Sequence, residues 1–260
     1  MNYETLIYSK KDRYAEIRFN RPHRLNAVVT EFYTEILDAL NKAEHDGEVR
    51  TIVLTGEGRA FCVGADLKEH SKGERTDLEK LEYLNLGNDV CQRIYEHPKV
   101  VIAAVNGFAL GAGCEMSVSS DFILMKETAQ IGLPEISIGT HVGGAVTEIL
   151  PRIIGLAKTR ELIFTWRRID GNEAHAIGLA TRVFSEEEFD AGVREFAGLV
   201  ASKAPVSMQF AKQHLNDMHQ DYKSRLTTEI AALRTCMLTK DWQEGVDSFA
   251  EKREPVFIGN

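Results

Sequence analysis

Hydrophobic and polar residues follow two different periods along the first two thirds of the chain. Apolar and polar side chains alternate in Tyr14–Phe19, whereas residues 51–55, Val100–Val105 and 121–125 are short, almost continuous apolar runs. Alternation is typical of a half-buried β-strand, and a short apolar run is typical of a strand buried on both faces. We therefore predict strands at these four positions.

Segments with helical spacing separate these runs. Within residues 30–43, apolar side chains recur every three or four positions, and Thr30 is the predicted N-cap. The charged stretch Asp77–Glu96 is the next predicted helix. Because strands and helices alternate in this way, the predicted fold class is α/β.

The alternation ends near Phe184, and only helical patterns follow. The main predicted helices cover residues 187–202, 207–217 and 227–238. We therefore divide the chain into a core, residues 1–195, and a helical appendage, residues 196–260.

The composition of the chain limits the kinds of molecule that it is expected to bind. The chain has 260 residues, 43% of them hydrophobic, which is enough for one large core, and its formal net charge is −8. A nucleic-acid or anionic-membrane surface needs clustered Lys and Arg, so we expect neither partner. The first residues lack an apolar signal core, and no apolar run approaches the length of about 18 residues that spans a membrane. We expect a cytoplasmic protein.

The four cysteines are scattered along the chain, at positions 62, 91, 114 and 236. They form no CxxC motif and no Cys/His cluster, so we expect neither a metal site nor a disulfide framework. Reduced, mostly buried thiols are the simplest interpretation.

Two glycine-framed turns have the character of anion-binding sites. Gly64-Ala65-Asp66 follows a bulky apolar run, and Gly111-Ala112-Gly113 follows a strand end. Each turn is predicted to lead into a helix, where the first N–H groups have no acceptor within the helix. Such amides are free to point at an anion.

Two glutamates lie in apolar surroundings near these turns. Glu115 lies one turn inside the helix that follows Ala112, and Glu135 lies in a glycine-rich loop between Pro134 and Ile136. Burial would raise the pKa of either carboxyl towards the range that suits acid–base catalysis. The alternatives are a first-turn glutamate that complements the helix dipole for Glu115, and a solvated loop glutamate for Glu135.

The two glycine-framed turns and the two glutamates together are suited to chemistry at a carbonyl group. A pair of oriented N–H groups stabilises an enolate-like oxygen by about 3–4 kcal/mol per well-placed donor. The two carboxylates would then exchange protons with the carbon skeleton and a water molecule.

Several ordered motifs resemble the crotonase (enoyl-CoA hydratase/isomerase) superfamily across essentially the whole chain. They are the two turns, the Glu135 loop, Asn20-Arg-Pro, and the segments 60–66, 98–107 and 249–253. The resemblance implies a superhelix of repeated ββα units with a C-terminal helical trimerisation region, assembled as a homotrimer or as a homohexamer built from two trimers.

The resemblance also implies roles for individual residues. Ala65 and Ala112 match the positions whose backbone N–H groups form the oxyanion hole of the family. Glu115 and Glu135 match the two catalytic glutamates of the hydratases, and Gly143 matches a glycine whose backbone helps to place the water.

The implied substrate is an acyl-CoA thioester, in which coenzyme A is part of the substrate and no cofactor is permanently bound. Phe249 and Lys252 match a pair that reaches coenzyme A from a neighbouring subunit. The full set of residues implied for binding substrate and coenzyme A is Arg24, Ala65, Asp66, Leu67, Lys68, Ala112, Phe249 and Lys252.

Two departures from the family pattern leave the acyl group open. Trp166 stands where glycine is usual, and either walls the acyl pocket or packs at a surface. His141 stands where apolar residues are common, and either touches the substrate or is structural. Short-chain, aromatic, alicyclic and carnitine-type acyl groups all fit the sequence.

Retention of both glutamates favours hydration of an enoyl-CoA. Isomerases of the family usually keep only the carboxylate that matches Glu135, because a double-bond shift needs one base. Other acyl-CoA reactions on this scaffold, such as hydrolysis or C–C cleavage, are alternatives, and so is a non-catalytic binding protein of the RNA-associated kind. Gly107, Gly111 and Gly113 do not have the G-x-G-x-x-G spacing of a dinucleotide-binding turn, which excludes that class.

Overall fold

The computed structural model describes residues 3–71, 73, 75–203, 205–217, 222–253 and 255. Its strands are β1 (Leu6–Lys11), β2 (Tyr14–Phe19), β3 (Thr51–Gly56), β4 (Ala60–Cys62), β5 (Val100–Val105), β6 (Phe108–Leu110), β7 (Phe122–Lys126), β8 (Gln130–Gly132), β9 (Ile169–Asp170) and β10 (Arg182–Phe184).

Helices connect and cover these strands. They are α1 (Thr30–His45), α2 (Leu67–His70), α3 (Asp77–Glu96), α4 (Ala112–Val118), α5 (Val146–Ile154), α6 (Leu156–Thr165), α7 (Gly171–Ala176), α8 (Phe189–Ala201), α9 (Pro205–Asp217), α10 (Tyr222–Met237) and α11 (Lys240–Glu251). Two short 3₁₀ helices, η1 (Pro22–Arg24) and η2 (Glu135–Ile138), interrupt the loops.

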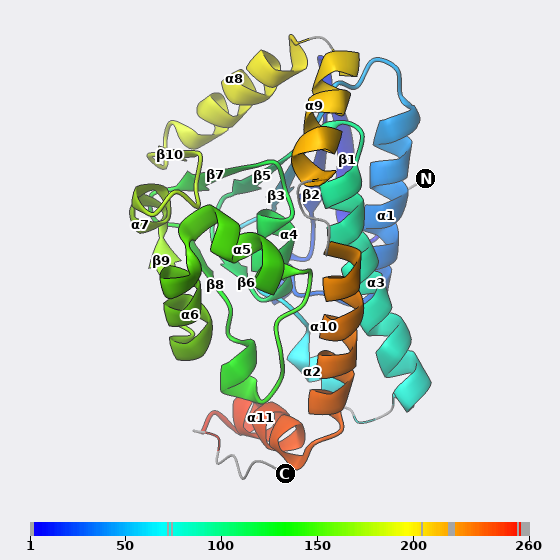
Figure 1. Ribbon diagram of the computed structural model, residues 1–260, viewed down its shortest axis with the longest axis vertical. Helices are drawn as coiled ribbons and strands as arrows, with labels where there is room; N and C mark the ends of the chain where they lie inside the picture. Colours follow the sequence, from blue (N-terminus) through cyan, green and yellow to red (C-terminus); the bar gives the residue numbers. More distant parts are fainter. Residues whose placement is uncertain are drawn as a thin grey trace.

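Two sheets run through the molecule. The larger has the order β1-β2-β3-β5-β7-β10, parallel except for the β1–β2 hairpin, and the smaller has the order β4-β6-β8-β9 (Figure 1). The consecutive pairs β3/β4, β5/β6 and β7/β8 each place their first strand in the larger sheet and their second in the smaller. Helical segments follow each pair, so the predicted α/β class and the predicted ββα repeat are confirmed.

The larger sheet is buried on both faces, which explains its almost continuous apolar strands. In β5, Val101, Ala103 and Val105 pack into the main core with α1 and α3. Ile102 and Ala104 pack into a second core under α8. A period of two residues therefore divides one apolar run between two cores.

The predicted elements are present, with differences at their ends. Thr30 is the first residue of α1 and makes no side-chain cap, so its predicted N-cap role is wrong. The strand predicted from residue 121 begins at Phe122, because the Asp121 carboxylate accepts a hydrogen bond from Val101 N–H at 2.8 Å and pairs with Lys212 at 2.7 Å. The helix predicted from residue 227 begins at Tyr222.

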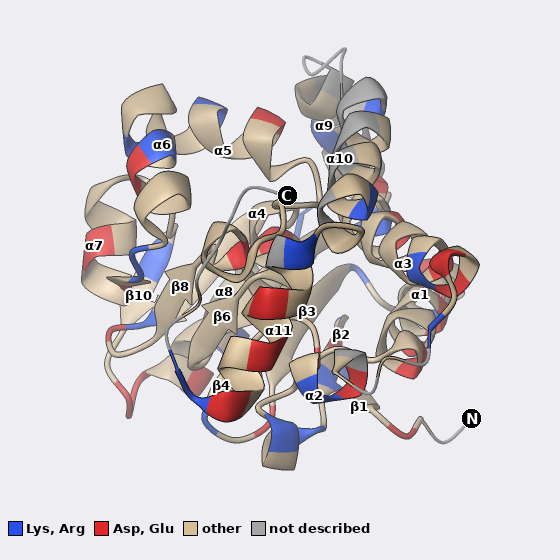
Figure 2. Ribbon diagram, turned by 90° about the horizontal axis from the view of Figure 1, so that it is seen from below, with Lys and Arg blue, Asp and Glu red and all other residues tan. Residues whose placement is uncertain are grey.

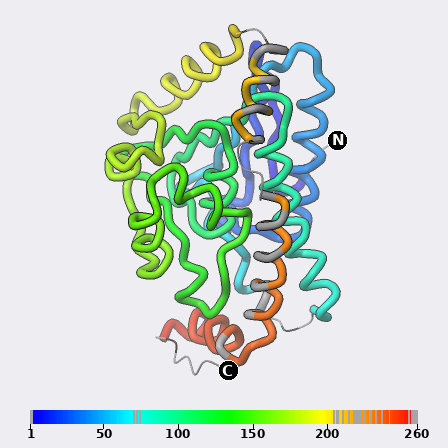
Figure 3. The backbone as a smooth tube through the Cα atoms, in the orientation of Figure 1, coloured from blue at the N-terminus to red at the C-terminus, as the bar shows by residue number. Residues whose placement is uncertain are grey.

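The C-terminal helices pack onto the core of their own chain. The tube in Figure 3 shows α10 running alongside α3, and α11 closing the end of the molecule where η2 lies. Residue 195, the predicted boundary between core and appendage, falls inside α8. The predicted role of residues 196–260 in oligomerisation stays a prediction.

Charged residues of both signs are dispersed over the molecule when it is seen from the α11 end (Figure 2). Among the described residues, no helix is long and apolar enough to cross a membrane, and no group of three or more His, Cys, Asp or Glu side chains has a metal-binding arrangement. Cys62, Cys91 and Cys114 are buried free thiols, and the Cys236 side chain lies outside the described part.

Candidate active site

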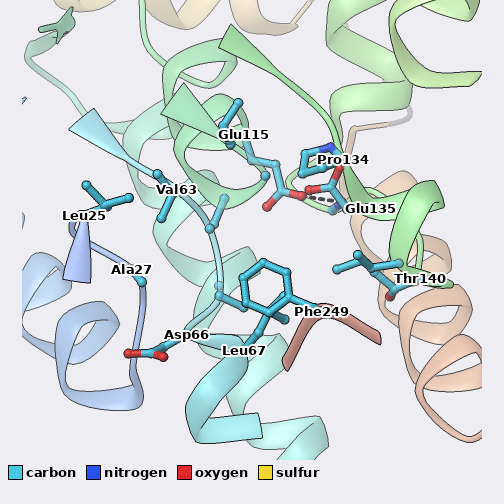
Figure 4. A pocket seen from close by; sticks show the side chains of 18 of the residues that line it. Leu25, Ala27, Val63, Asp66, Leu67, Glu115, Pro134, Glu135, Thr140 and Phe249 are labelled. Carbon is cyan, nitrogen blue, oxygen red and sulfur yellow. Dashed lines mark hydrogen bonds between the residues drawn. The ribbon is translucent and has the colours of Figure 1, made fainter. Parts of the chain in front are cut away.

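A cavity of about 680 Å³ lies where the smaller sheet, α3, α4, η2 and the C-terminal helices meet (Figure 4). Both glycine-framed turns and both candidate glutamates line it. The C-terminal helices complete the wall with Leu233, Met237, Trp242 and Phe249. The appendage is therefore part of the site of its own chain, which the sequence did not reveal.

The first turn directs the amide of Ala65 towards the cavity. Ala65 forms an isolated parallel bridge with Val28, in which Val28 N–H donates to the Gly64 carbonyl at 2.8 Å and Asp66 N–H donates to the Val28 carbonyl at 3.0 Å. In a parallel bridge of this register, the amide of the central residue points to the opposite side. Ala65 N–H has no acceptor among the described residues.

The second turn places the amide of Ala112 beside the first. Gly111 has a φ of +53°, and Ala112 is the first residue of α4, so its N–H has no acceptor within the helix. A Cβ atom added to Gly64 would lie 3.5 Å from the Ala112 nitrogen, which shows how closely the two turns abut. The structure thus brings two unpaired amides close together, and their role as an oxyanion hole stays a prediction.

Gly113 sets the separation of the two turns. A Cβ atom at this position would lie 2.1 Å from the Cys62 carbonyl oxygen, far inside contact distance. The start of α4 therefore packs directly on the backbone of β4, and only glycine permits this approach.

Glu115 is oriented by a loop amide. Gly143 N–H donates to Glu115 Oε1 at 2.7 Å, so an N–H dipole lies against one carboxylate oxygen. A hydrogen bond of this kind favours the charged form of a carboxyl group. Gly143 was predicted to place the water. In the structure the Gly143 amide donates its hydrogen bond to Glu115, and the water-placing role stays a prediction.

Glu135 is held differently, at the start of η2. The residue is only 8% exposed, and its Oε2 atom is buried without a hydrogen-bond partner among the described residues. Burial and the negative charge of Glu115 raise the pKa of Glu135 well above its ordinary range. The alternative of a solvated loop glutamate is therefore wrong.

The two carboxyl groups face one another in the cavity (Figure 4). Two negative charges this close in apolar surroundings repel strongly, so the pair favours a single shared negative charge. The Gly143 amide favours that charge on Glu115, and burial favours the proton on Glu135. This arrangement suits one proton acceptor and one proton donor, and the catalytic roles of the two glutamates stay a prediction.

Replacement of Glu135 by Gln is expected to raise the melting temperature, increasingly so at higher pH. The folded-state pKa of Glu135 is raised, so the folded protein keeps a proton that the unfolded chain releases above its ordinary pKa of 4.5. Ionisation therefore favours unfolding as pH rises through that window, and Gln removes this effect.

Melting curves of wild type and Glu135→Gln between about pH 5 and about pH 8 measure this difference. Glu187→Gln, at an exposed position, is the matched control and should show no widening gap. If the difference in melting temperature between Glu135→Gln and wild type stays constant or narrows as pH rises, the buried, protonated state of Glu135 is contradicted.

The residues predicted to bind coenzyme A divide into two groups. Arg24, Leu67 and Lys68 line the cavity, and their contact with coenzyme A stays a prediction. The Asp66 side chain is 5% exposed, pairs with Arg21 at 3.3 Å and points away from the two glutamates (Figure 4). Its side chain therefore stabilises the turn, and contact with coenzyme A stays a prediction.

Phe249 lines the cavity of its own chain, although the family pattern predicted that it reaches the site of a neighbouring subunit. Lys252 follows the end of α11 with a φ of +56° and is not among the described residues that line the cavity. Its contact with coenzyme A stays a prediction.

Trp166 and His141 both line the cavity. Trp166 adopts the left-handed conformation, with a φ of +46°, where glycine is favoured, and the Arg168 guanidinium lies 5.2 Å from its ring centroid. His141 Nδ1 lies 2.7 Å from the Val142 carbonyl oxygen. Both positions are therefore within reach of a bound substrate.

Sequence reasoning missed Tyr33, Tyr83 and Asn88, which also line the cavity. The Tyr33 and Tyr83 rings lie 5.5 Å apart, and the Tyr83 hydroxyl donates to the Val28 carbonyl at 3.5 Å. At helical spacing, both tyrosines look like ordinary core residues, so no local signal could have identified them.

Comparison with known proteins places these features in a family. The sequence profile described as enoyl-CoA hydratase/isomerase matches residues 9–260. The chain is 35% identical over 260 residues to a crotonyl-CoA hydratase of Syntrophomonas wolfei, covering 99% of both chains. It is 36% identical over 256 residues to a short-chain-enoyl-CoA hydratase of Clostridium acetobutylicum, covering 98% of this chain and 97% of that one.

Solved structures show the same architecture. The fold is similar to the crystal structure of an enoyl-CoA hydratase from Mycobacterium avium subsp. paratuberculosis, with a TM-score of 0.90 and 26% sequence identity. The alignment covers 99% of this chain and 100% of that one.

Proposed function

Because this chain belongs to the enoyl-CoA hydratase/isomerase family, we propose that it adds water across the α,β double bond of an enoyl-CoA thioester. The observation that carries the proposal is the facing pair Glu115 and Glu135, the first oriented by an amide and the second buried, with no partner for its Oε2 atom among the described residues. The resemblance found in the sequence is confirmed at the level of the family.

The thioester oxygen binds between the amides of Ala65 and Ala112. Charge develops on this oxygen when the β-carbon is attacked, and the two N–H groups stabilise it by about 3–4 kcal/mol per donor. The coenzyme A part of the bound substrate extends out of the cavity past Arg24 and Lys68, whose positive charges attract its phosphate groups. No permanently bound cofactor enters this scheme.

Glu115 and Glu135 divide the proton transfers between them. Glu115 takes a proton from water as the water oxygen bonds to the β-carbon, and the π electrons move to the thioester oxygen. When the enolate collapses, the α-carbon takes the proton of Glu135. Proton exchange between the facing carboxyl groups, or with solvent, restores the starting state.

The preferred acyl group is short. The curated relatives are named for crotonyl-CoA and short-chain enoyl-CoA. In this chain, Tyr33 and Tyr83 belong to the main core, so the cavity wall that they form has close-packed side chains behind it. Assembly as a trimer or hexamer and a cytoplasmic location complete the proposal.

A panel of trans-2-enoyl-CoA thioesters with short, long and aromatic acyl groups tests the proposal. Loss of the conjugated-thioester absorbance, with formation of the 3-hydroxyacyl product, is expected to be fastest for the short chains. Absence of hydration for every thioester would contradict it. A double-bond shift that survives in Glu115→Gln but not in Glu135→Gln would instead identify an isomerase.

Binding of RNA by this chain, with no binding of CoA thioesters, would identify a non-catalytic member of the fold. Titration of the same preparation with butyryl-CoA and with single-stranded RNA separates the two classes. We expect binding of the thioester only, because the chain carries a net charge of −8 and charged residues of both signs are dispersed in the view of Figure 2.

A further inference from the structure

Asn88 is a buried amide in the middle of α3 that makes two directed hydrogen bonds. It is 8% exposed. Its Oδ1 accepts a hydrogen bond from Gly144 N–H at 3.2 Å, and its Nδ2 donates to the Leu226 carbonyl of α10 at 3.1 Å. One side chain therefore joins α3, the loop before α5 and a C-terminal helix.

The loop that Asn88 holds is the one that orients Glu115. Gly143 N–H donates to Glu115 Oε1, and the next amide in the chain, that of Gly144, donates to Asn88. Gly144 and Ala145 both have positive φ angles, 61° and 59°. Consecutive left-handed residues are costly for the backbone and need fixed partners to persist.

Packing around the same loop leaves it little freedom. A Cβ atom on Gly144 would lie 2.9 Å from Cys91 Sγ and 3.0 Å from Glu115 Cβ. On the other side, a Cβ atom on Gly143 would lie 3.3 Å from Leu233 Cδ1 of α10. The loop is thus enclosed between α3, α4 and α10.

An amide side chain meets both demands at this position. A buried polar group is costly unless it is hydrogen-bonded, and here one end must accept while the other donates. Leucine, of similar size, does neither, and aspartate lacks the donor. The other buried residues of α3 are Tyr83, Val90, Cys91, Ile94 and Tyr95.

We propose that Asn88 is a positioning residue for the hydration reaction, acting through the Gly143–Gly144 backbone on the Glu115 carboxylate. This inference rests on the proposed function. Helix α10 also contributes to this positioning, because its Leu226 carbonyl accepts a hydrogen bond from the Asn88 side chain. Asn88 acts through this backbone and exchanges no proton.

Asn88→Leu is expected to lower kcat by roughly 100-fold, because a displacement of about 1 Å in a catalytic group costs about that much. KM for crotonyl-CoA and Kd for butyryl-CoA should stay within about threefold, since the oxyanion amides are untouched. Asn85→Leu is the matched control, an exposed asparagine on the same helix, and should leave kcat unchanged.

A double-mutant cycle with Glu115→Gln separates positioning from a general structural role. If Asn88 acts through Glu115, Asn88→Leu should cost less than about threefold in the Glu115→Gln background, because the carboxylate it positions is already lost. An equal loss in both backgrounds would overturn the proposal, as would an unchanged kcat in Asn88→Leu.

Folding of each variant is checked by circular dichroism and by butyryl-CoA binding. If Asn88→Leu does not fold, Asn88→Ser takes its place in the same cycle, with the same expected coupling and the same contradicting results. Wild type is assayed alongside. Absence of hydration by wild type rejects the proposed function. If wild type is active and the effects of Asn88→Leu and Glu115→Gln on kcat are additive, only the role of Asn88 is rejected.

Discussion

Glu115→Gln and Glu135→Gln are each expected to slow hydration of crotonyl-CoA by about 10²–10⁴-fold. Gln keeps the size of the side chain but neither takes a proton from water nor gives one to carbon. Because the thioester is held by the amides of Ala65 and Ala112, the loss should appear in kcat and much less in KM. Initial rates at saturating substrate measure it.

The double variant is expected to be little slower than the slower single variant, because the two carboxyl groups act as one proton-transfer unit. Glu187→Gln, an exposed glutamate, is the control and should match wild type. Retention of more than about one tenth of the wild-type rate in either single variant would contradict a direct catalytic role for that residue.

Gly113→Ala is expected to abolish activity and to lower the melting temperature markedly. Its Cβ atom would lie 2.1 Å from the Cys62 carbonyl oxygen, which is backbone and has no other conformation to adopt. The start of α4 must then move away from β4, and the Ala112 amide separates from the Ala65 amide. We expect a loss of at least about 100-fold in kcat/KM, comparable to loss of an oxyanion donor.

Gly198→Ala is the matched control, because that glycine is exposed in α8 and has nothing within 4 Å of an added Cβ atom. Removal of a helical glycine there should leave activity unchanged and raise stability by up to about 1 kcal/mol. An active Gly113→Ala protein with a wild-type melting temperature would show that the approach of α4 to β4 is not needed.

Patterns within one element were sufficient to predict the strands β2, β3, β5 and β7 of the larger sheet, but not the short strands of the smaller sheet. The apolar run of β5 and the helix Asp77–Glu96 have the predicted bounds. The ends that differ depend on distant partners. Strand β7 starts one residue late because Asp121 bonds to Val101 and Lys212, and no local pattern contains those contacts.

The candidate site could be predicted from the sequence only in part, because contacts between distant parts of the chain leave no local pattern. Glu115 and Glu135 could be singled out because apolar neighbours in the chain signalled burial. Asn88 could not, since an asparagine in a charged helix reads as a solvent-facing residue, and its partners Gly144 and Leu226 are far away in the chain.

The wall that the C-terminal helices form in the cavity of their own chain was missed, because the chain was divided at residue 195. Leu233 and Met237 have the spacing of any buried helical face, and the identity of the surface they cover is a property of the fold. The proposed assembly into trimers or hexamers therefore has to be compatible with helices that already line the cavity of their own chain.

Isotope incorporation during turnover of crotonyl-CoA by wild-type protein tests the central claim most directly. In deuterium oxide enriched in ¹⁸O, hydration by the proposed route places one deuterium on the α-carbon and one ¹⁸O on the β-carbon, with the thioester intact. Mass spectrometry of the product reads both. An intact, unlabelled β-carbon, a shifted double bond, or ¹⁸O only in a freed carboxylate would contradict the account.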